Sequence, residues 1–252
     1  MKMHCLSGGR GRMRKSVYIP EADRSEMIEV PVSCMLLRHP QGNVLFDTGC
    51  HPDVAKDPAA RWGGMVKFMM PIMPEGDHVL TGLSCLGLSP DDIDVVVCSH
   101  LHIDHCGCNA FFKRATVMLH EKEIAAARAP NAEWMGYLAA EWDFGTFDAL
   151  SGERDVFGDG RIVLIPLPGH TPGSIGALVA LEKTGTVLLA GDTVSLRATI
   201  DRNIAPRNTQ DPQALLKSWE EIRRIEARGA TVLCGHDDAQ WQTLRKGADF
   251  YD

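Results

Sequence analysis

A short segment of the chain, Ser-His-Leu-His-Ile-Asp-His at residues 99–105, concentrates side chains that bind metal ions. Three histidines and one aspartate lie within six positions, directly after the apolar run 95–98. Imidazole nitrogens and carboxylate oxygens are the ligands that divalent zinc prefers, at about 2.0–2.2 Å. A single buried histidine is usually explained by hydrogen bonding, but so dense a group is not. The segment therefore predicts a metal site.

The spacing within this segment suits two ions rather than one. If the preceding strand continues through His100 and His102, these two side chains point to the same face. Asp104 and His105 follow where the chain must turn, so they can approach that face from another direction. The segment thus offers two pairs of ligands, but two pairs are too few to complete two coordination shells.

The missing ligands are expected at three further strand ends, each with a glycine before an ionisable residue. The stretches LPGH, LLAGD and VLCGH deliver His170, Asp192 and His236. Glycine permits the sharp turn that exposes the next side chain at the edge of a sheet. The five other histidines lack this context and are expected on the surface or in the core, with His51 the nearest to the site: His4, His39, His51, His78 and His120.

The elements that must position these residues are strands interleaved with helices. Apolar, β-branched runs bounded by Gly, Pro or Asp predict strands at 29–39, 43–47, 94–99, 115–120, 161–167, 175–181, 186–190 and 230–235. A tight turn at 39–43 predicts a hairpin. Helices are expected over 120–143, with an interruption at Pro130, and over 211–229. This order predicts mixed sheets covered by helices in one domain, residues 1–252.

Composition and charge restrict the class of protein. The chain has 252 residues, 44% hydrophobic residues and a net charge of -7, which argues against nucleic-acid partners and against attraction to anionic membranes. No secretory signal or membrane-spanning run is recognised, so a cytoplasmic location is expected. In a reducing compartment most of the eight cysteines are expected to be buried thiols rather than disulfides. The sequence leaves open whether the chain forms a homodimer.

The segment 62–73, Trp-Gly-Gly-Met-Val-Lys-Phe-Met-Met-Pro-Ile-Met, is rich in methionine. Its apolar side chains either belong to the core or form a flexible apolar lip over a pocket or a subunit contact, because methionine adapts to varied apolar partners.

The pattern HLHIDH, with GH at 169–170, GD at 191–192 and GH at 235–236, resembles the metallo-β-lactamase superfamily over nearly the whole chain. The resemblance implies an α/β fold, an αββα four-layer sandwich with two mixed sheets and a two-metal centre between them. It implies that one metal, expected to be Zn²⁺, binds to His100, His102 and His170. It implies that a second metal binds to Asp104, His105 and His236, and that Asp192 bridges both. Asp47 of FDTG would orient a ligand.

The stretches 31–49, 88–112 and 235–252 are similar to the N-acyl homoserine lactonase group. The resemblance implies a quorum-quenching hydrolase that opens a small lactone through a hydroxide held between two metals, with Asp104 passing a proton to the departing oxygen. A thioester hydrolase of the glyoxalase II type is the alternative enzyme, although cationic residues that would bind glutathione are scattered. A non-catalytic, metal-stabilised lactone-binding protein is the third possibility.

One departure from the lactonase group concerns a tyrosine. That group has a tyrosine three residues after the bridging aspartate, where it helps to polarise the lactone carbonyl, but this chain has Ser195. The other tyrosines of the chain are Tyr18, Tyr137 and Tyr251. Tyr137, in the helical segment, is the candidate replacement, and a packing role is its alternative.

Overall fold

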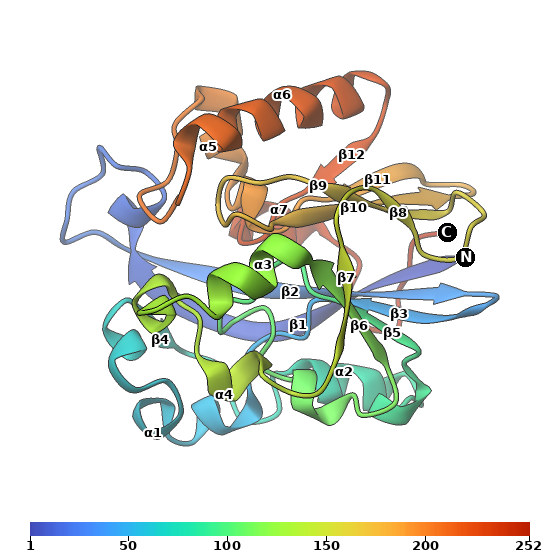
Figure 1. The fold of residues 1–252 in the computed structure, drawn as a ribbon, viewed down its shortest axis with the longest axis horizontal. Helices are drawn as coiled ribbons and strands as arrows, with labels where there is room; N and C mark the ends of the chain where they lie inside the picture. Colours follow the sequence, from blue (N-terminus) through green and yellow to red (C-terminus); the bar gives the residue numbers. More distant parts are fainter.

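The computed structural model describes residues 1–252 and contains two mixed sheets (Figure 1). The seven-stranded sheet has the order β4-β1-β2-β3-β5-β6-β7. Its strands are β1 (Lys2–Arg14), β2 (Met27–His39), β3 (Gly42–Phe46), β4 (Met69–Pro71), β5 (Val95–Val97), β6 (Thr116–His120) and β7 (Phe147–Leu150). Strands β4, β1, β2 and β3 pair antiparallel, whereas β3, β5, β6 and β7 pair parallel.

The five-stranded sheet has the order β12-β11-β10-β9-β8. Its strands are β8 (Arg154–Asp155), β9 (Ile162–Pro166), β10 (Ile175–Leu181), β11 (Gly185–Leu189) and β12 (Thr231–Leu233). Only β11 and β12 pair parallel. Parallel neighbours matter here because their carboxyl ends meet at one edge of the sheet, and both β11 and β12 are followed by predicted ligands.

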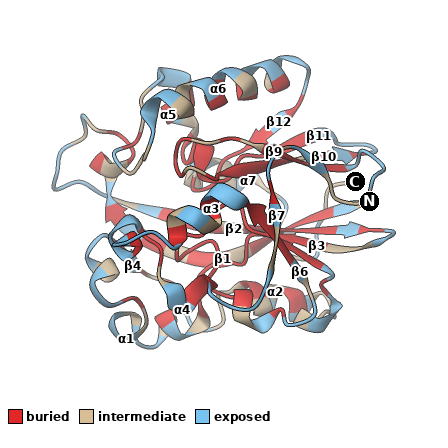
Figure 2. Ribbon diagram, in the orientation of Figure 1, coloured by how far each residue is buried: buried red, intermediate tan, exposed pale blue.

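The layers follow from which face of each element is apolar. The largest cluster between the sheets combines alternate residues of both, such as Leu37 and Val97 with Leu164 and Ala177. Alternation sends the remaining apolar residues to the outer faces, where helices cover them, and Figure 2 shows the resulting buried interior. The predicted αββα sandwich is confirmed.

Helices cover the outer faces of the sheets (Figure 1). Helices α2 (Val79–Cys85), α3 (Glu121–Ala127) and α4 (Ala139–Trp142) pack on the seven-stranded sheet, and α5 (Arg197–Arg202) and α6 (Pro212–Ala227) on the five-stranded sheet. Short α1 (Pro58–Trp62) and α7 (Asp238–Thr243) complete the set. Helix α6 begins at Pro212 after the cap Asp211, and its predicted apolar face is buried: Leu215, Trp219, Ile222 and Ile225.

Short 3-10 helices complete the assignment. They are η1 (Lys15–Val17), η2 (Pro52–Ala55), η3 (Gly63–Lys67), η4 (Pro90–Asp92), η5 (Asn109–Phe111), η6 (Ala132–Met135) and η7 (Gly191–Val194). No helix in the chain combines the length and apolar character that crossing a membrane would need.

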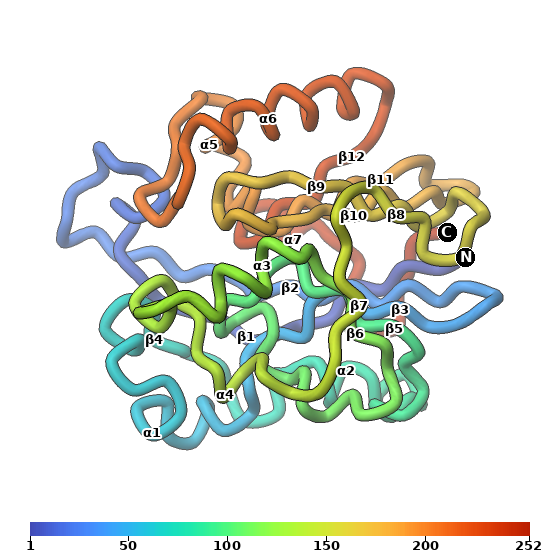
Figure 3. Tube along the Cα trace, in the orientation of Figure 1, coloured from blue at the N-terminus to red at the C-terminus, as the bar shows by residue number.

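All eight predicted strands are present, and the 39–43 turn joins β2 to β3 as an antiparallel hairpin. Four strands were not predicted: β1, β4, β7 and β8. The first thirty residues lack a clear apolar alternation, yet β1 pairs along its length with β2. Tertiary pairing therefore determined β1. The two chain ends lie side by side (Figure 3), and near them Met3 forms an antiparallel bridge with Tyr251.

The cysteine prediction is confirmed, since all eight are free thiols and only Cys85 is exposed. The 62–73 segment has both core residues and exposed apolar residues, so each of its two interpretations applies to part of it. Met69 and Met73 are buried, whereas Phe68 is 59% exposed and Met70 43% exposed.

Candidate metal centre

The segment 99–105 forms a loop, because strand β5 ends at Val97. The expectation that the strand continues through His100 and His102 is therefore wrong. The loop lacks a strand ladder, and buried carboxylates accept two of its backbone N–H groups instead. Ser99 N donates to Asp47 Oδ1 at 2.7 Å, and Leu101 N donates to Glu123 Oε1 at 3.0 Å.

Both carboxylates also reach beyond the loop. Asp47, which adopts a left-handed conformation with φ of 59°, accepts a hydrogen bond from Ser99 Oγ and contacts His105 Nδ1 at 2.9 Å. Glu123 accepts hydrogen bonds from Thr171 Oγ1 at 2.7 Å and from Gly173 N at 3.1 Å. Glu123 thus joins the 99–105 loop to the loop after β9. No motif in the sequence singled it out.

The three other predicted ligands come from the five-stranded sheet. His170 follows β9, Asp192 lies in η7 directly after β11, and His236 follows β12. Backbone hydrogen bonds from Gly235 N to the carbonyl of Val194 and from His236 N to the carbonyl of Ser195 connect the ends of β11 and β12. His236 Nδ1 lies 2.8 Å from the carbonyl oxygen of Pro31, which directs Nε2 toward the cluster.

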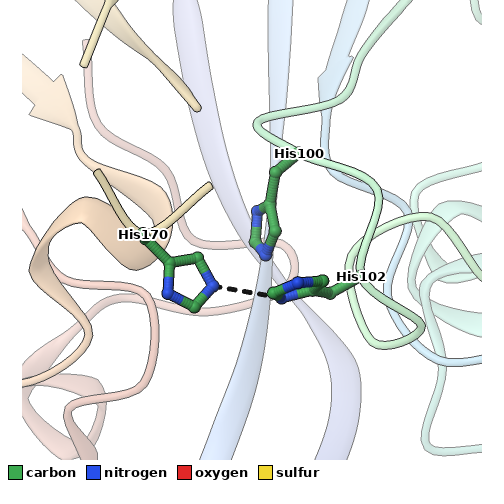
Figure 4. Close-up of side chains that lie close together, drawn as sticks. All are labelled: His100, His102 and His170. Carbon is green, nitrogen blue, oxygen red and sulfur yellow. Dashed lines mark hydrogen bonds between the residues drawn. The ribbon is translucent and has the colours of Figure 1, made fainter. Parts of the chain in front are cut away.

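All seven predicted residues meet at this end of the sandwich. Potential ligand atoms of His100, His102 and His170 lie within 4.8 Å of one another, and so do those of Asp104, His105 and His236. Figure 4 shows His100, His102 and His170 converging from two different loops, with His170 Nε2 3.0 Å from His102 Nδ1.

Asp192 lies between the two groups of three. Its Oδ1 is 3.0 Å from His236 Nε2 and 3.5 Å from His105 Nε2, while its Oδ2 is 3.5 Å from His170 Nε2. The two oxygens of one carboxylate thus face opposite groups, as expected of a bridging ligand.

The cluster is buried, and its charges are strongly coupled. Burial and the neighbouring histidines hold the pKa of His100 and His102 well below the usual value. Burial also disfavours charge on His105, yet the carboxylates of Asp104 and Asp47 raise its pKa to about 10. Burial opposes ionisation of Asp192 too, but His236 and His105 outweigh it and keep the Asp192 pKa well below its usual range.

The residues fit divalent metal ions. Nitrogens bound to one tetrahedral zinc at about 2.0–2.1 Å lie roughly 3.3 Å apart, close to the 3.0 Å between His170 and His102 and the 3.4 Å between His105 and His236. His100 Nε2 is buried without any hydrogen-bond partner. A buried orphaned nitrogen costs free energy unless something binds it. The donor set of imidazoles and carboxylates is the set that zinc prefers.

A cavity of about 440 Å³ opens onto the cluster. His102, Asp104, Asp192 and His236 line its floor, and its apolar wall includes Met13, Met65, Phe68, Met69, Ile103 and Trp134. The 62–73 segment therefore supplies part of a pocket lip. Cavities of this volume with apolar walls and a few polar groups are typical of small-molecule sites.

Ser195 and Tyr137 lie apart from the cavity. Ser195 is buried and donates through Oγ to the carbonyl of Asp192 at 3.2 Å. The Tyr137 ring packs 5.2 Å from that of His102, but its hydroxyl accepts a hydrogen bond from Gln210 Nε2 and Tyr137 does not line the cavity. His51 does not line it either, because its Nδ1 caps η2.

Tyr18 is the tyrosine that does line the cavity. It is 2% exposed, and its ring lies 6.0 Å from that of His236. The sequence offered no signal for this position, because Tyr18 lies more than 80 residues before the 99–105 loop and outside any recognised motif.

Comparisons with known proteins agree with this geometry. The sequence model of the metallo-β-lactamase superfamily matches residues 27–236. An N-acyl homoserine lactonase of Azorhizobium caulinodans, AttM, is 32% identical over 89% of this chain and 88% of its own. Another, AiiB of Agrobacterium fabrum, is 33% identical over 90% of this chain and 87% of its own.

A solved structure is similar to this chain over nearly its whole length. An N-acyl homoserine lactone hydrolase with the product N-hexanoyl-L-homoserine at its catalytic metal centre superposes with a TM-score of 0.89, at 25% identity, over 99% of this chain and 98% of its own. A match over most of the length, with seven potential ligands converging at one end of an αββα sandwich, leads to one conclusion. The chain belongs to the metallo-β-lactamase superfamily.

Proposed function

We propose that this chain is a hydrolase that opens the ring of N-acyl homoserine lactones or closely related small lactones with two bound divalent ions, which we propose to be Zn²⁺. The observation that carries the proposal is the convergence of seven ligand-type side chains, four of which line the floor of a largely apolar cavity. The relatives named as N-acyl homoserine lactonases support the choice of substrate.

In this proposal each ion has its own ligands and Asp192 is shared. The first ion is held by His100, His102 and His170, and the second by Asp104, His105 and His236. Support comes from the grouping of the side chains and from the two oxygens of Asp192 that face opposite groups. The shared hydrophobic core of both sheets supports the proposal that residues 1–252 act as one domain.

Bound divalent ions supply a nucleophilic water at neutral pH and polarise an ester carbonyl. The chain's own residues determine what happens around that chemistry. Asp104 is 6% exposed and lines the cavity, so it takes the proton that the attacking water releases and passes it to the ring oxygen when the ring C–O bond breaks. The apolar wall formed by Met65, Phe68 and Trp134 contacts the acyl chain and excludes water from it.

The cavity disfavours the thioester alternative. A glutathione thioester carries carboxylates that need cationic partners, and Arg207 is the only Lys or Arg lining the cavity. Its guanidinium already donates to the carbonyls of Ser16 and Pro20. The wall instead suits an uncharged acyl chain.

The test is a substrate panel on the metal-loaded protein: N-hexanoyl-L-homoserine lactone, a glutathione thioester and a phosphoester. We expect turnover of the lactone, two metal ions per chain, and loss of both turnover and metal in His102→Ala. The matched control is His78→Ala, because His78 is outside the cluster and only partly buried. Tight lactone binding without turnover would identify a binding protein, and preferential thioester turnover would contradict the proposal.

Chelation provides a second readout of the same proposal. A ligand at 100 to 1,000 times its Kd stabilises the folded state by about 2.7–4.1 kcal/mol. Removing the ions should therefore lower Tm by roughly 5–15 °C. Calorimetry would measure this change. A melt that chelator does not change would argue against a filled site.

A further inference from the structure

Hydrolysis of a lactone places negative charge on the oxygen of its carbonyl group, and a fixed hydrogen-bond donor at that position stabilises the charge. The cluster residues that line the cavity floor are imidazoles and carboxylates, which the proposed function uses as ligands. A neutral donor beside them must come from another element. This inference rests on the proposed lactonase function.

Tyr18 is such a donor. It lines the same cavity as Asp104 and Asp192, and its ring packs against His236 at 6.0 Å with an interplanar angle of 44°. Its hydroxyl makes no hydrogen bond to another group of the chain, yet it is not among the fully buried polar atoms that lack a partner. The oxygen therefore keeps some accessible surface, on a residue that lines the cavity. A phenol is protonated at neutral pH and can donate.

Arg207, Gln210 and Thr209, which also line the cavity, are less suitable donors. Arg207 donates to Ser16 O at 3.0 Å and to Pro20 O at 2.9 Å, and Gln210 Nε2 donates to the Tyr137 hydroxyl at 3.2 Å. The Thr209 hydroxyl has no partner but is fully buried, so it does not open into the cavity.

Arg207 forms hydrogen bonds with the backbone both before and after Tyr18. Arg207 bonds to the carbonyls of Ser16 and Pro20 through its side chain, and its own N–H donates to Val17 O at 2.7 Å. Figure 3 shows this dark-blue segment after β1 beside the orange segment after α5. A donor held in place in this way needs little reorganisation during the reaction.

We propose that the Tyr18 hydroxyl donates a hydrogen bond to the carbonyl oxygen of the bound lactone and stabilises the negative charge that develops there. The oxygen of water forms a bond to the carbonyl carbon, and the C=O π pair moves onto the oxygen that Tyr18 contacts. The pair then re-forms the carbonyl as the ring C–O bond breaks. The ring oxygen leaves with that bond's electrons and takes the water's proton from Asp104, so Tyr18 itself gains and loses no proton.

The experiment compares wild type with Tyr18→Phe, which keeps the ring against His236 and removes only the hydroxyl. Loss of one donor to a developing oxyanion costs about 10²–10³ in kcat in a known case, so we expect kcat for N-hexanoyl-L-homoserine lactone to fall at least tenfold. KM should stay within about threefold. Metal content and Tm should match wild type.

A binding measurement supplies a readout that does not depend on turnover. The ring-opened product N-hexanoyl-L-homoserine has a carboxylate oxygen where the lactone carbonyl was. Calorimetric titration should show its Kd raised threefold or more by Tyr18→Phe. Tyr251→Phe is the matched control. Tyr251 is far from Tyr18 in the chain and does not line the cavity, and its hydroxyl accepts a hydrogen bond from Arg245 N. This variant should leave kcat and product binding unchanged.

Unchanged kcat in Tyr18→Phe would overturn the inference while leaving the lactonase proposal intact. A loss of kcat accompanied by loss of metal would also overturn it, since Tyr18 would then only support His236. If wild type itself fails to hydrolyse lactones, both proposals fall together.

Discussion

The two sides of the candidate metal centre carry their predicted ligands in different ways. On the seven-stranded sheet, one loop of seven residues carries His100, His102, Asp104 and His105. On the five-stranded sheet, three separate strand ends carry one ligand each, and a glycine precedes every one of them. The first arrangement is local in sequence, whereas the second depends on strands that are far apart in the chain.

This difference determines what each side needs for rigidity. Pairing of β11 with β12 positions Asp192 and His236, because the strand ladder sets where both strand ends lie. The 99–105 loop has no ladder, and the buried carboxylates of Asp47 and Glu123 accept its N–H groups. A cluster of ligands that is compact in sequence thus relies on polar support from elsewhere.

The largest expected effect comes from replacing Asp192, the residue that we propose both ions share. Asp192→Asn keeps the shape of the side chain but removes its charge, so each ion loses a carboxylate oxygen. We expect the fold to persist while metal content and lactone turnover fall together, turnover by more than about 100-fold. Metal analysis and kinetics on the same sample check this. Retained turnover with one ion lost would contradict the two-metal mechanism.

A glycine substitution tests the strand-end side alone. A Cβ at Gly235 would lie 2.4 Å from Asp192 Oδ1 and 2.9 Å from Gly191 O. Relieving this overlap costs about 1–3 kcal/mol, so Gly235→Ala should lower Tm by roughly 3–10 °C and weaken metal binding. The control is Gly152→Ala, where a Cβ meets no atom within 4 Å. Equal melting temperatures for the two variants would show that this close approach is not required.

The smallest effect is expected on the loop side. Glu123→Gln keeps the size of the side chain but replaces one acceptor oxygen by a donor, so at least one N–H or hydroxyl partner loses its acceptor. The loss of that acceptor costs about 1–3 kcal/mol of folding free energy. We expect the lower end of this range, because burial raises the pKa of the Glu123 carboxyl and so already disfavours its charged form. Turnover should fall about threefold to tenfold. A normal melt with complete loss of turnover would instead indicate a role in the chemistry.

Much of the candidate site could be predicted from the sequence, for a physical reason. A ligand must have a particular donor atom, and a strand end must have a turn residue, so His170, Asp192 and His236 are recognisable by type and by the preceding glycine. An apolar run bounded by turn residues predicted the strand at 175–181, which is the observed extent of β10. Strand β1 could not be predicted in this way, because its pairing with β2 outweighs its own weak pattern.

The tyrosines show where local reasoning fails. Tyr137 was the candidate replacement for the missing tyrosine, with a packing role as its alternative, and its hydroxyl turns to Gln210. Tyr18 lies near the start of the chain. It lines the cavity because Arg207, nearly 190 residues later, forms hydrogen bonds with its segment.

The sequence by itself determined the chemistry available to this protein: which side chains can bind metal, and which strands end beside them. Only the tertiary structure decided which polar groups support the ligand loop and which hydroxyl faces the cavity. The reason is that donor-atom chemistry belongs to the residue, whereas the direction of a side chain depends on packing against elements that are distant in the chain.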